Sequence, residues 1–198
     1  MISAVILSAG SSSRMGSPKA LLEIGGVTFL RHIVDVLASA SVLDVVIVLG
    51  SDSGRIRPSL GWFGGTIVEN AAWRHGQLSS LIAGIDAVSA REDVHGAMLC
   101  PVDHPLISHS LIVDLLQAFW RSKKKIIIPL HKGVRGHPVI FRRELFAELR
   151  RAPGAIGARA VVRGHPAEIA EVPTEVQGAV INIDTTAEYE RYVSGTNQ

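Results

Sequence analysis

The sequence predicts an α/β protein in which a mostly parallel central sheet is flanked by helices. Three short runs, at residues 4–7, 45–49 and 97–100, are apolar throughout, which is typical of strands buried on both faces. The segments between these runs carry apolar residues at helical spacing, so that predicted strands and helices alternate along the chain. Such alternation favours crossover connections and therefore parallel strands.

Three segments have the apolar spacing of a helix. The first follows Thr28 with apolar residues at 30, 33, 34 and 37, and the second follows Ser79 and Ser80 with apolar residues at 81, 82, 85 and 88. The third follows Ser108 with apolar residues at 111, 112, 115, 116 and 119, and a strand-like run comes next at 126–128. A hydroxyl residue before an apolar repeat is typical of a helix N-cap.

The half of the chain after residue 134 is less regular. Glycine and proline interrupt it repeatedly, and the two candidate strands, at 139–141 and 169–172, are short. We expect some antiparallel strands there, and a terminal helix that carries Tyr189 and Tyr192. Because no repeat and no long linker occurs, we expect one domain over residues 1–198.

Composition narrows the class of protein. The chain has 198 residues with 47% hydrophobic content, which is enough for one sizeable core, and its net charge of +2 does not favour nucleic acid or a membrane surface as a partner. It has one cysteine and no run near the roughly 20 apolar residues that span a bilayer. Without a secretory signal pattern at the N-terminus, we expect the cytoplasm.

The loop after the first predicted strand is suited to bind phosphates. Residues 7–19 read Leu-Ser-Ala-Gly-Ser-Ser-Ser-Arg-Met-Gly-Ser-Pro-Lys. Small residues let backbone N–H groups approach phosphate oxygens, and Arg14 and Lys19 supply positive charge at the same place. The loop is not a P-loop, because Met15 stands where the P-loop needs its second glycine. It is not a dinucleotide fingerprint either, because Ser12 stands where that motif needs its second glycine. An ordinary glycine turn is the alternative.

Asp103 is the candidate metal ligand, because an apolar strand ends in this acid just before Pro105, which places a carboxylate at the edge of the sheet. One or two protein oxygens and a triphosphate can complete the coordination of Mg²⁺. A turn-forming aspartate is the alternative. In addition, Gly10 and Ser51 follow two other predicted strands, so three polar segments are expected to converge at the carboxyl ends of the strands.

The pattern of these segments resembles that of the molybdenum cofactor cytidylyltransferases and their guanylyltransferase relatives. The resemblance rests on residues 7–16 with Lys19 and continues, in the same order, through residues 70–81, 101–106, 136–141 and 182–185. It implies a Rossmann-like nucleotidyltransferase fold with a nucleotide-binding N-terminal half and an acceptor-binding C-terminal half. It also implies Mg²⁺ as the cofactor.

The resemblance assigns roles to individual residues. Arg14, Lys19 and Asp103 are expected to be catalytic, and His137 to bind the acceptor. Asn182 and Asp184 join Asp103 as candidate metal ligands, although Asp184 or Thr185 could instead cap the terminal helix. The residues expected to bind the nucleotide are Leu7, Ser8, Ala9, Gly10, Ser12, Arg14, Lys19, Gln77, Ser79 and Ser80.

The reaction implied is transfer of CMP from CTP to the phosphate of molybdopterin loaded with molybdenum, with release of pyrophosphate. Ala9 favours CTP over GTP, because the guanylyl enzymes have glycine at this position, and a methyl group can bar a larger base. A molybdoenzyme or its chaperone is the expected transient partner. The alternatives are a guanylyl or other nucleotidyltransferase with a different phosphorylated acceptor, and a noncatalytic protein that delivers a nucleotide or cofactor.

Other conspicuous residues have simpler interpretations. The eight histidines lack the spacing of a zinc site, so we expect no zinc. Cys100 lies in an apolar run and is expected in the core rather than as a nucleophile. Lys123, Lys124 and Lys125 are expected at a solvated helix end.

Overall fold

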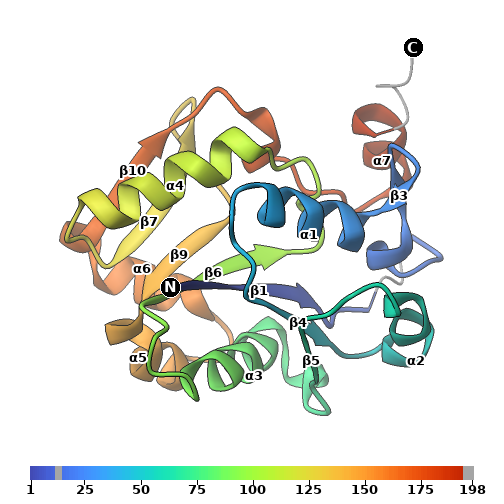
Figure 1. The fold of residues 1–198 in the computed structure, drawn as a ribbon, viewed down its shortest axis with the longest axis horizontal. Helices are drawn as coiled ribbons and strands as arrows, with labels where there is room; N and C mark the ends of the chain where they lie inside the picture. The colour runs from blue at the N-terminus through green and yellow to red at the C-terminus, as the bar shows by residue number, and fades with distance from the viewer. Residues whose placement is uncertain (12–14, 194–198) are drawn as a thin grey trace.

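A computed structural model describes residues 1–11 and 15–193 of the chain. The main sheet has the strand order β10-β7-β9-β6-β1-β4-β5, with β8 paired to β7, and Figure 1 shows it between two layers of helices. A two-stranded ribbon, β2 with β3, lies outside it. The strands are β1 (Ile2–Ser8), β2 (Glu23–Ile24), β3 (Val27–Thr28), β4 (Val45–Leu49), β5 (Thr66–Glu69), β6 (Gly96–Pro101), β7 (Ile126–His131), β8 (Val134–Arg135), β9 (Val139–Arg142) and β10 (Ile169–Pro173).

The predicted mixture of parallel and antiparallel strands is confirmed. β1 pairs in parallel with β4 and β6, and β4 pairs in parallel with β5. In the main sheet the antiparallel pairs involve strands of the C-terminal half, where β9 lies between β6 and β7 and β8 folds back on β7. β10 then returns parallel to β7 at the sheet edge.

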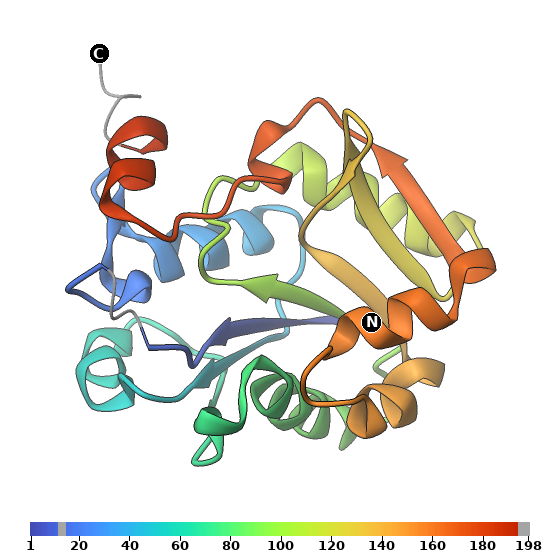
Figure 2. The same cartoon turned by 180° about the vertical axis from the view of Figure 1, so that it is seen from behind.

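Helices cover both faces of the sheet, which explains why its central strands are apolar throughout. Their bounds are α1 (Phe29–Ser39), α2 (Ser53–Ile56), α3 (Gln77–Ser89), α4 (His109–Arg121), α5 (Phe146–Arg151), α6 (Ala158–Gly164) and α7 (Thr186–Tyr192). α1 and α4 pack on one face, and α3, α5 and α6 pack on the other (Figure 1 and Figure 2). Alternate residues of β1 serve the two layers, with Ile6 in the first core cluster and Val5 and Leu7 in the second.

The caps of the three predicted helices differ from expectation in one case. Thr28 and Ser108 each accept a hydrogen bond from the backbone N–H three residues on, as N-caps do. α3 instead begins at Gln77, after Gly76, and no side chain caps it. Ser79 and Ser80 therefore lie inside the first turn of α3 rather than before it.

The C-terminal helix α7 packs against residues from the N-terminal part of the chain. Its Tyr189 ring lies 5.9 Å from the ring of Phe29 in α1, and the Tyr189 hydroxyl donates to the backbone oxygen of Glu23. These contacts attach α7 beside β2 and α1 (Figure 2). Within residues 1–11 and 15–193, no helix is both long and apolar enough to cross a membrane.

Gly84 lets α3 pack closely on the sheet. A Cβ atom there would overlap Val5 Cγ1 and lie 3.2 Å from Val48 Cγ2, whereas a Cβ atom at Gly54 in α2 would meet nothing within 4 Å. We expect Gly84→Ala to lower the free energy of unfolding by about 1 kcal/mol or more, because overpacking costs more than the gain in helix propensity. Gly54→Ala is the control and is expected to leave stability unchanged or slightly raised. Urea denaturation of both variants measures the difference, and equal midpoints would contradict the packing argument.

Candidate active site

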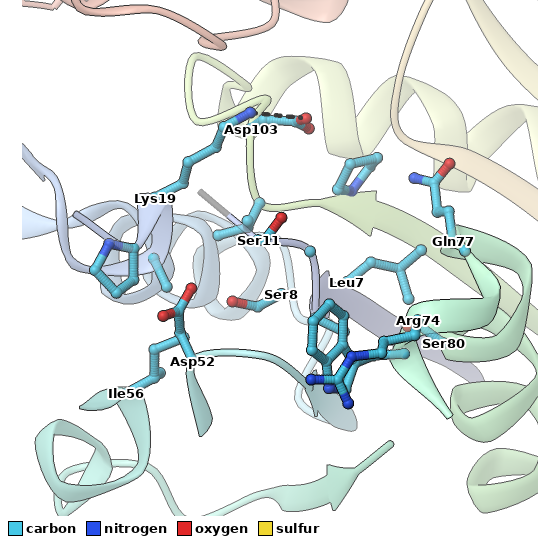
Figure 3. Close-up of a pocket in the computed structure, with 18 residues that line it drawn as sticks. Leu7, Ser8, Ser11, Lys19, Asp52, Ile56, Arg74, Gln77, Ser80 and Asp103 are labelled. Atoms are coloured by element: carbon cyan, nitrogen blue, oxygen red, sulfur yellow. Dashed lines mark hydrogen bonds and ion pairs between the residues drawn. The ribbon is translucent and has the colours of Figure 1, made fainter. Parts of the chain in front are cut away.

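A cavity of about 420 Å³ opens at the carboxyl ends of β1, β4 and β6. Figure 3 shows side chains from the first loop, from the segments after β4 and β6, and from the start of α3 around it. The strand ends are connected by backbone hydrogen bonds: Val102 N donates to Leu7 O at 3.1 Å, and Ser51 N donates to Ala9 O at 3.2 Å. The predicted convergence of three polar segments is therefore present in the structure.

Lys19 joins two acids that are far apart in the sequence. Its Nζ lies 3.4 Å from Asp103 Oδ2 and also forms an ion pair with Asp184 Oδ1. The backbone brings the acids together, because Ile183 N donates to Asp103 O at 2.7 Å. All three side chains are 14 to 30% exposed, so the screening by water is limited. The structure thus places a cation and two carboxylates at the edge of the cavity.

In the segment before α7, one residue caps the helix and its neighbour Asp184 forms the ion pair with Lys19. Thr185 caps α7: its Oγ1 accepts from Glu188 N at 3.2 Å, and Glu188 Oε2 accepts from the backbone N–H groups of Asp184 and Thr185. These bonds lower the pKa of Glu188. Asn182 Nδ2 donates to Asp184 Oδ2 at 2.6 Å. The alternative of helix capping therefore applies to Thr185, and the Asp184 carboxylate turns toward Lys19.

The chemistry of these side chains fits a hard divalent cation. Asp103 and Asp184 supply carboxylate oxygens, and Asn182 adds an amide oxygen, which are the donors that Mg²⁺ and Mn²⁺ prefer. Among the described residues, no group of three or more histidine, cysteine, aspartate or glutamate side chains could hold a metal ion by itself. A cation at this place would therefore need further oxygens from a ligand, as the phosphates of a nucleotide supply.

The first loop contributes much of the cavity wall. Leu7, Ser8, Ala9, Gly10 and Lys19, all predicted to bind the nucleotide, line the cavity. A Cβ atom at Gly10 would meet no described residue within 4 Å, which leaves the backbone there accessible from the described side of the cavity. Two other predicted residues, Ser12 and Arg14, lie outside the described residues.

The start of α3 forms another part of the wall, with Gln77 and Ser80 lining the cavity. The uncapped N-terminus of this helix suits an anion or the polar edge of a base. The other predicted serine, Ser79, does not line the cavity: its hydroxyl donates to Ala72 O and accepts from Asn70 Nδ2, both at 2.9 Å. Asn70, which is 8% exposed, also donates to Ser80 Oγ and thereby shapes this turn.

A second cavity of about 400 Å³ adjoins the first and shares Leu7, Gly76 and Gln77 with it. His137, the predicted acceptor ligand, lines this second cavity together with residues 154–159, which include Arg159. The structure therefore places His137 away from Lys19 and Asp103 but in a space that continues into theirs.

His137 packs against His104, the residue that follows Asp103, with 4.8 Å between the ring centroids. Burial is the main cause that lowers the pKa of His137 to about 3, and the neighbouring His104 and Arg159 act in the same direction. Burial also lowers the pKa of His104, against the opposing effect of Asp103 and Asp184. Both rings are therefore neutral near pH 7. Within the described part of the chain, neither Nδ1 atom has a hydrogen-bond partner.

Asp52, Trp73 and Arg74 are among the residues of the first cavity to which the sequence analysis gave no role. The guanidinium of Arg74 lies 4.6 Å from the centre of the Trp73 ring. Trp73 and Arg74 lie within residues 70–81, a segment of the resemblance to which no role was given. Asp52 stands in no motif, but it follows an apolar strand just as Asp103 does, and that signal could have identified it. Cys100 is 2% exposed, and burial raises the pKa of its thiol, which agrees with the expected place in the core.

Comparison with known proteins gives consistent results. Residues 4–170 match the MobA-like NTP transferase domain. A molybdenum cofactor guanylyltransferase of Rhodopseudomonas palustris is 31% identical over 92% of this chain and 86% of its own length. The molybdenum cofactor cytidylyltransferase of Escherichia coli is 25% identical over 96% of this chain and 97% of its own length.

Solved structures share the fold. The crystal structure of Rv0371c from Mycobacterium tuberculosis H37Rv is 25% identical, with a TM-score of 0.84 and coverage of 98% of both chains. A complex of Rv0371c with manganese has a TM-score of 0.77 at 24% identity, again over 98% of both chains. The mostly parallel sheet flanked by helices is therefore that of Rossmann-like nucleotidyltransferases, as predicted.

The low pKa of His137 predicts an acid-sensitive fold. Because the unfolded chain takes up a proton near pH 6.5 and the folded chain only near pH 3, the stability due to neutral His137 is complete above pH 6.5 and is lost as the pH falls toward 3. Between pH 7 and pH 5 this loss is about 2 kcal/mol. Urea denaturation at both pH values is expected to show a loss that is smaller by about this amount in His137→Gln than in the wild type, with the part due to His104 retained. The exposed His75→Gln serves as the control, and equal pH dependence in all three proteins would contradict the assignment.

Proposed function

The chain belongs to the MobA-like NTP transferase family, and we propose that it transfers CMP from CTP to the phosphate of the molybdenum cofactor. In this reaction an oxygen of the acceptor phosphate attacks the α-phosphorus of CTP. The new P–O bond forms as the bond between the α- and β-phosphates breaks, and pyrophosphate leaves. The observation that carries the proposal is the grouping of Lys19 with Asp103 and Asp184 at the edge of the cavity.

The side chains on this edge suit a reaction between two anions. Lys19 supplies positive charge that offsets the charge of the phosphates in the transition state, and Arg14 is proposed to act with it. Asp103 and Asp184, with Asn182 beside them, would hold a divalent cation, which when bound neutralises phosphate charge. We propose Mg²⁺, and the manganese complex of the related Rv0371c supports a divalent metal in this fold.

The two adjoining cavities support separate binding sites for the nucleotide and for the acceptor. The first cavity is proposed to hold the nucleotide through Leu7, Ser8, Ala9, Gly10 and Lys19, with Ser12 and Arg14 from the same loop. Gln77 and Ser80 are proposed to add contacts from α3, and Ser79 to act through the hydrogen bonds that hold this turn. The second cavity, with His137 and Arg159, is proposed to receive the phosphorylated acceptor. Because the cavities share Leu7 and Gln77, the two reactants would meet where they join.

The proposal of CTP as the donor is supported by Ala9, which lines the nucleotide cavity and is 4% exposed. GTP is the second candidate, because the relative from Rhodopseudomonas palustris is named a guanylyltransferase. We also propose that the protein acts in the cytoplasm and passes its product to a molybdoenzyme or its chaperone.

Pyrophosphate release tests the proposed reaction. With Mg²⁺ and molybdenum cofactor present, CTP is expected to give product faster than GTP, and ATP and UTP are expected to give little, because pocket contacts of this kind separate bases by about 10-fold or more. Omission of the cofactor or addition of a chelator is expected to stop the release. Faster turnover with GTP than with CTP would identify GTP as the donor nucleotide. Absence of pyrophosphate release with every nucleotide would favour a noncatalytic delivery protein.

Substitution of the central residues tests their roles. Lys19→Ala and Asp103→Asn are each expected to lower kcat by about 100-fold or more, since each removes a charge that acts on the reacting phosphates. Circular dichroism and thermal unfolding are expected to show that both variants remain folded. Lys123→Ala and Asp86→Asn, at exposed positions away from the cavity, are the matched controls. Turnover at the wild-type rate in either site variant would contradict the assigned role.

A further inference from the structure

We propose that Asp52 reads the base of the nucleotide by accepting a hydrogen bond from its exocyclic amino group. The inference rests on the proposed function only in that the first cavity holds a nucleoside triphosphate. It assigns a specificity-determining residue to that cavity.

Asp52 occupies a helix N-cap without acting as one. It precedes α2, and aspartate at this position commonly accepts a bond from a backbone N–H of the first turn, yet no such side-chain bond is present. Figure 3 shows its carboxylate directed toward the cavity that it lines, near Ser8. The side chain is therefore available to a ligand rather than used to stabilise α2.

None of the described residues neutralises the carboxylate of Asp52. Within the part of the chain that the structure describes, its side chain forms no ion pair, and the hydrogen bond it accepts comes from Ser51 Oγ at 3.3 Å. Among residues 1–11 and 15–193, the other charged residues that line the cavity are Lys19, Asp103 and Arg74. Lys19 pairs with Asp103, and Arg74 stacks on Trp73. Asp52 thus presents a charged acceptor that needs a donor.

The position of Asp52 indicates which part of a nucleotide supplies that donor. Figure 3 shows the contact between Lys19 and Asp103 at the top of the view and the Asp52 carboxylate below it, beside Ser8. With the phosphates bound beside Lys19, the base is the part of the nucleotide farthest from them. A carboxylate next to the phosphates would repel them, whereas a carboxylate beside the base meets an uncharged group.

Cytosine and guanine both present a suitable donor. Cytosine has the amino group N4 and guanine has N2, and carboxylate side chains that read bases commonly accept from such groups. UTP has an oxygen in place of N4, and ITP has a hydrogen in place of N2. The inference therefore holds for either proposed donor nucleotide, and each has a natural counterpart without the amino group.

Calorimetric titration with Mg²⁺ and without an acceptor tests the inference. The wild type is expected to bind CTP more tightly than UTP, and GTP more tightly than ITP. Asp52→Asn is expected to lower both ratios by about 10-fold to 100-fold, the factor that a hydrogen bond to a charged group commonly contributes. Among the four nucleotides, UTP should gain most affinity for Asp52→Asn, because the amide introduced by the substitution could donate to its O4 oxygen. Thermal unfolding is expected to be unchanged, since no cap is lost.

The controls separate the inference from other roles of the residue. Asp35→Asn, on the exposed surface of α1, should retain the wild-type ratios. Unchanged binding ratios in Asp52→Asn would overturn the inference, and so would an equal loss of affinity for all nucleotides. A loss confined to the preference for CTP over 2′-deoxy-CTP would also overturn it, because that result would assign Asp52 to the ribose. If the wild type binds no nucleotide, the proposed function itself fails.

Discussion

The backbone hydrogen bond from Ile183 N to Asp103 O is the contact on which the arrangement of the candidate active site depends. It joins the segment after β6 to the segment before α7, and so brings Asp184 within reach of Lys19. Lys19 comes from the first loop, so three distant parts of the chain meet at one ion-pair network. Its limited exposure means that water screens these charges only in part, and a ligand here would meet a strong local field.

The sheet explains why the two cavities adjoin. β1 lies between β4 and β6, and its end is joined to the segments after both strands by backbone hydrogen bonds. Residues at the end of β1 therefore face both cavities, as Leu7 does. A donor nucleotide and a phosphorylated acceptor could then approach each other without a large movement of the protein, which suits a reaction in which correct positioning supplies much of the rate.

Two acids near the site do not serve as helix caps. Thr185 caps α7 in place of Asp184, and the side chain of Asp52 leaves α2 without a cap bond. An N-cap hydrogen bond commonly contributes about 1 kcal/mol to the stability of a helix. An acid that turns away from the cap position therefore leaves the helix without this contribution. Asp52 instead lines the space proposed for the nucleotide, and Asp184 pairs with Lys19, which lines it too. The same compromise holds for His137, whose burial keeps it neutral at the expense of stability in acid.

The sequence by itself determined the alternation of strands and helices, the N-caps at Thr28 and Ser108, and the convergence of the first loop with Asp103. These features follow from apolar spacing and local capping chemistry, which act over a few residues. Only the tertiary structure decided that Thr185 caps α7 while Asp184 pairs with Lys19, that α3 starts at Gln77, and that Asp52 lines the cavity. The cap at Thr185 is a local capping box with Glu188, but the sequence left it open whether Asp184 or Thr185 caps the helix. The ion pair of Asp184 with Lys19 and the position of Asp52 in the cavity depend on contacts between residues far apart in the chain, and local sequence preferences do not encode where such residues meet.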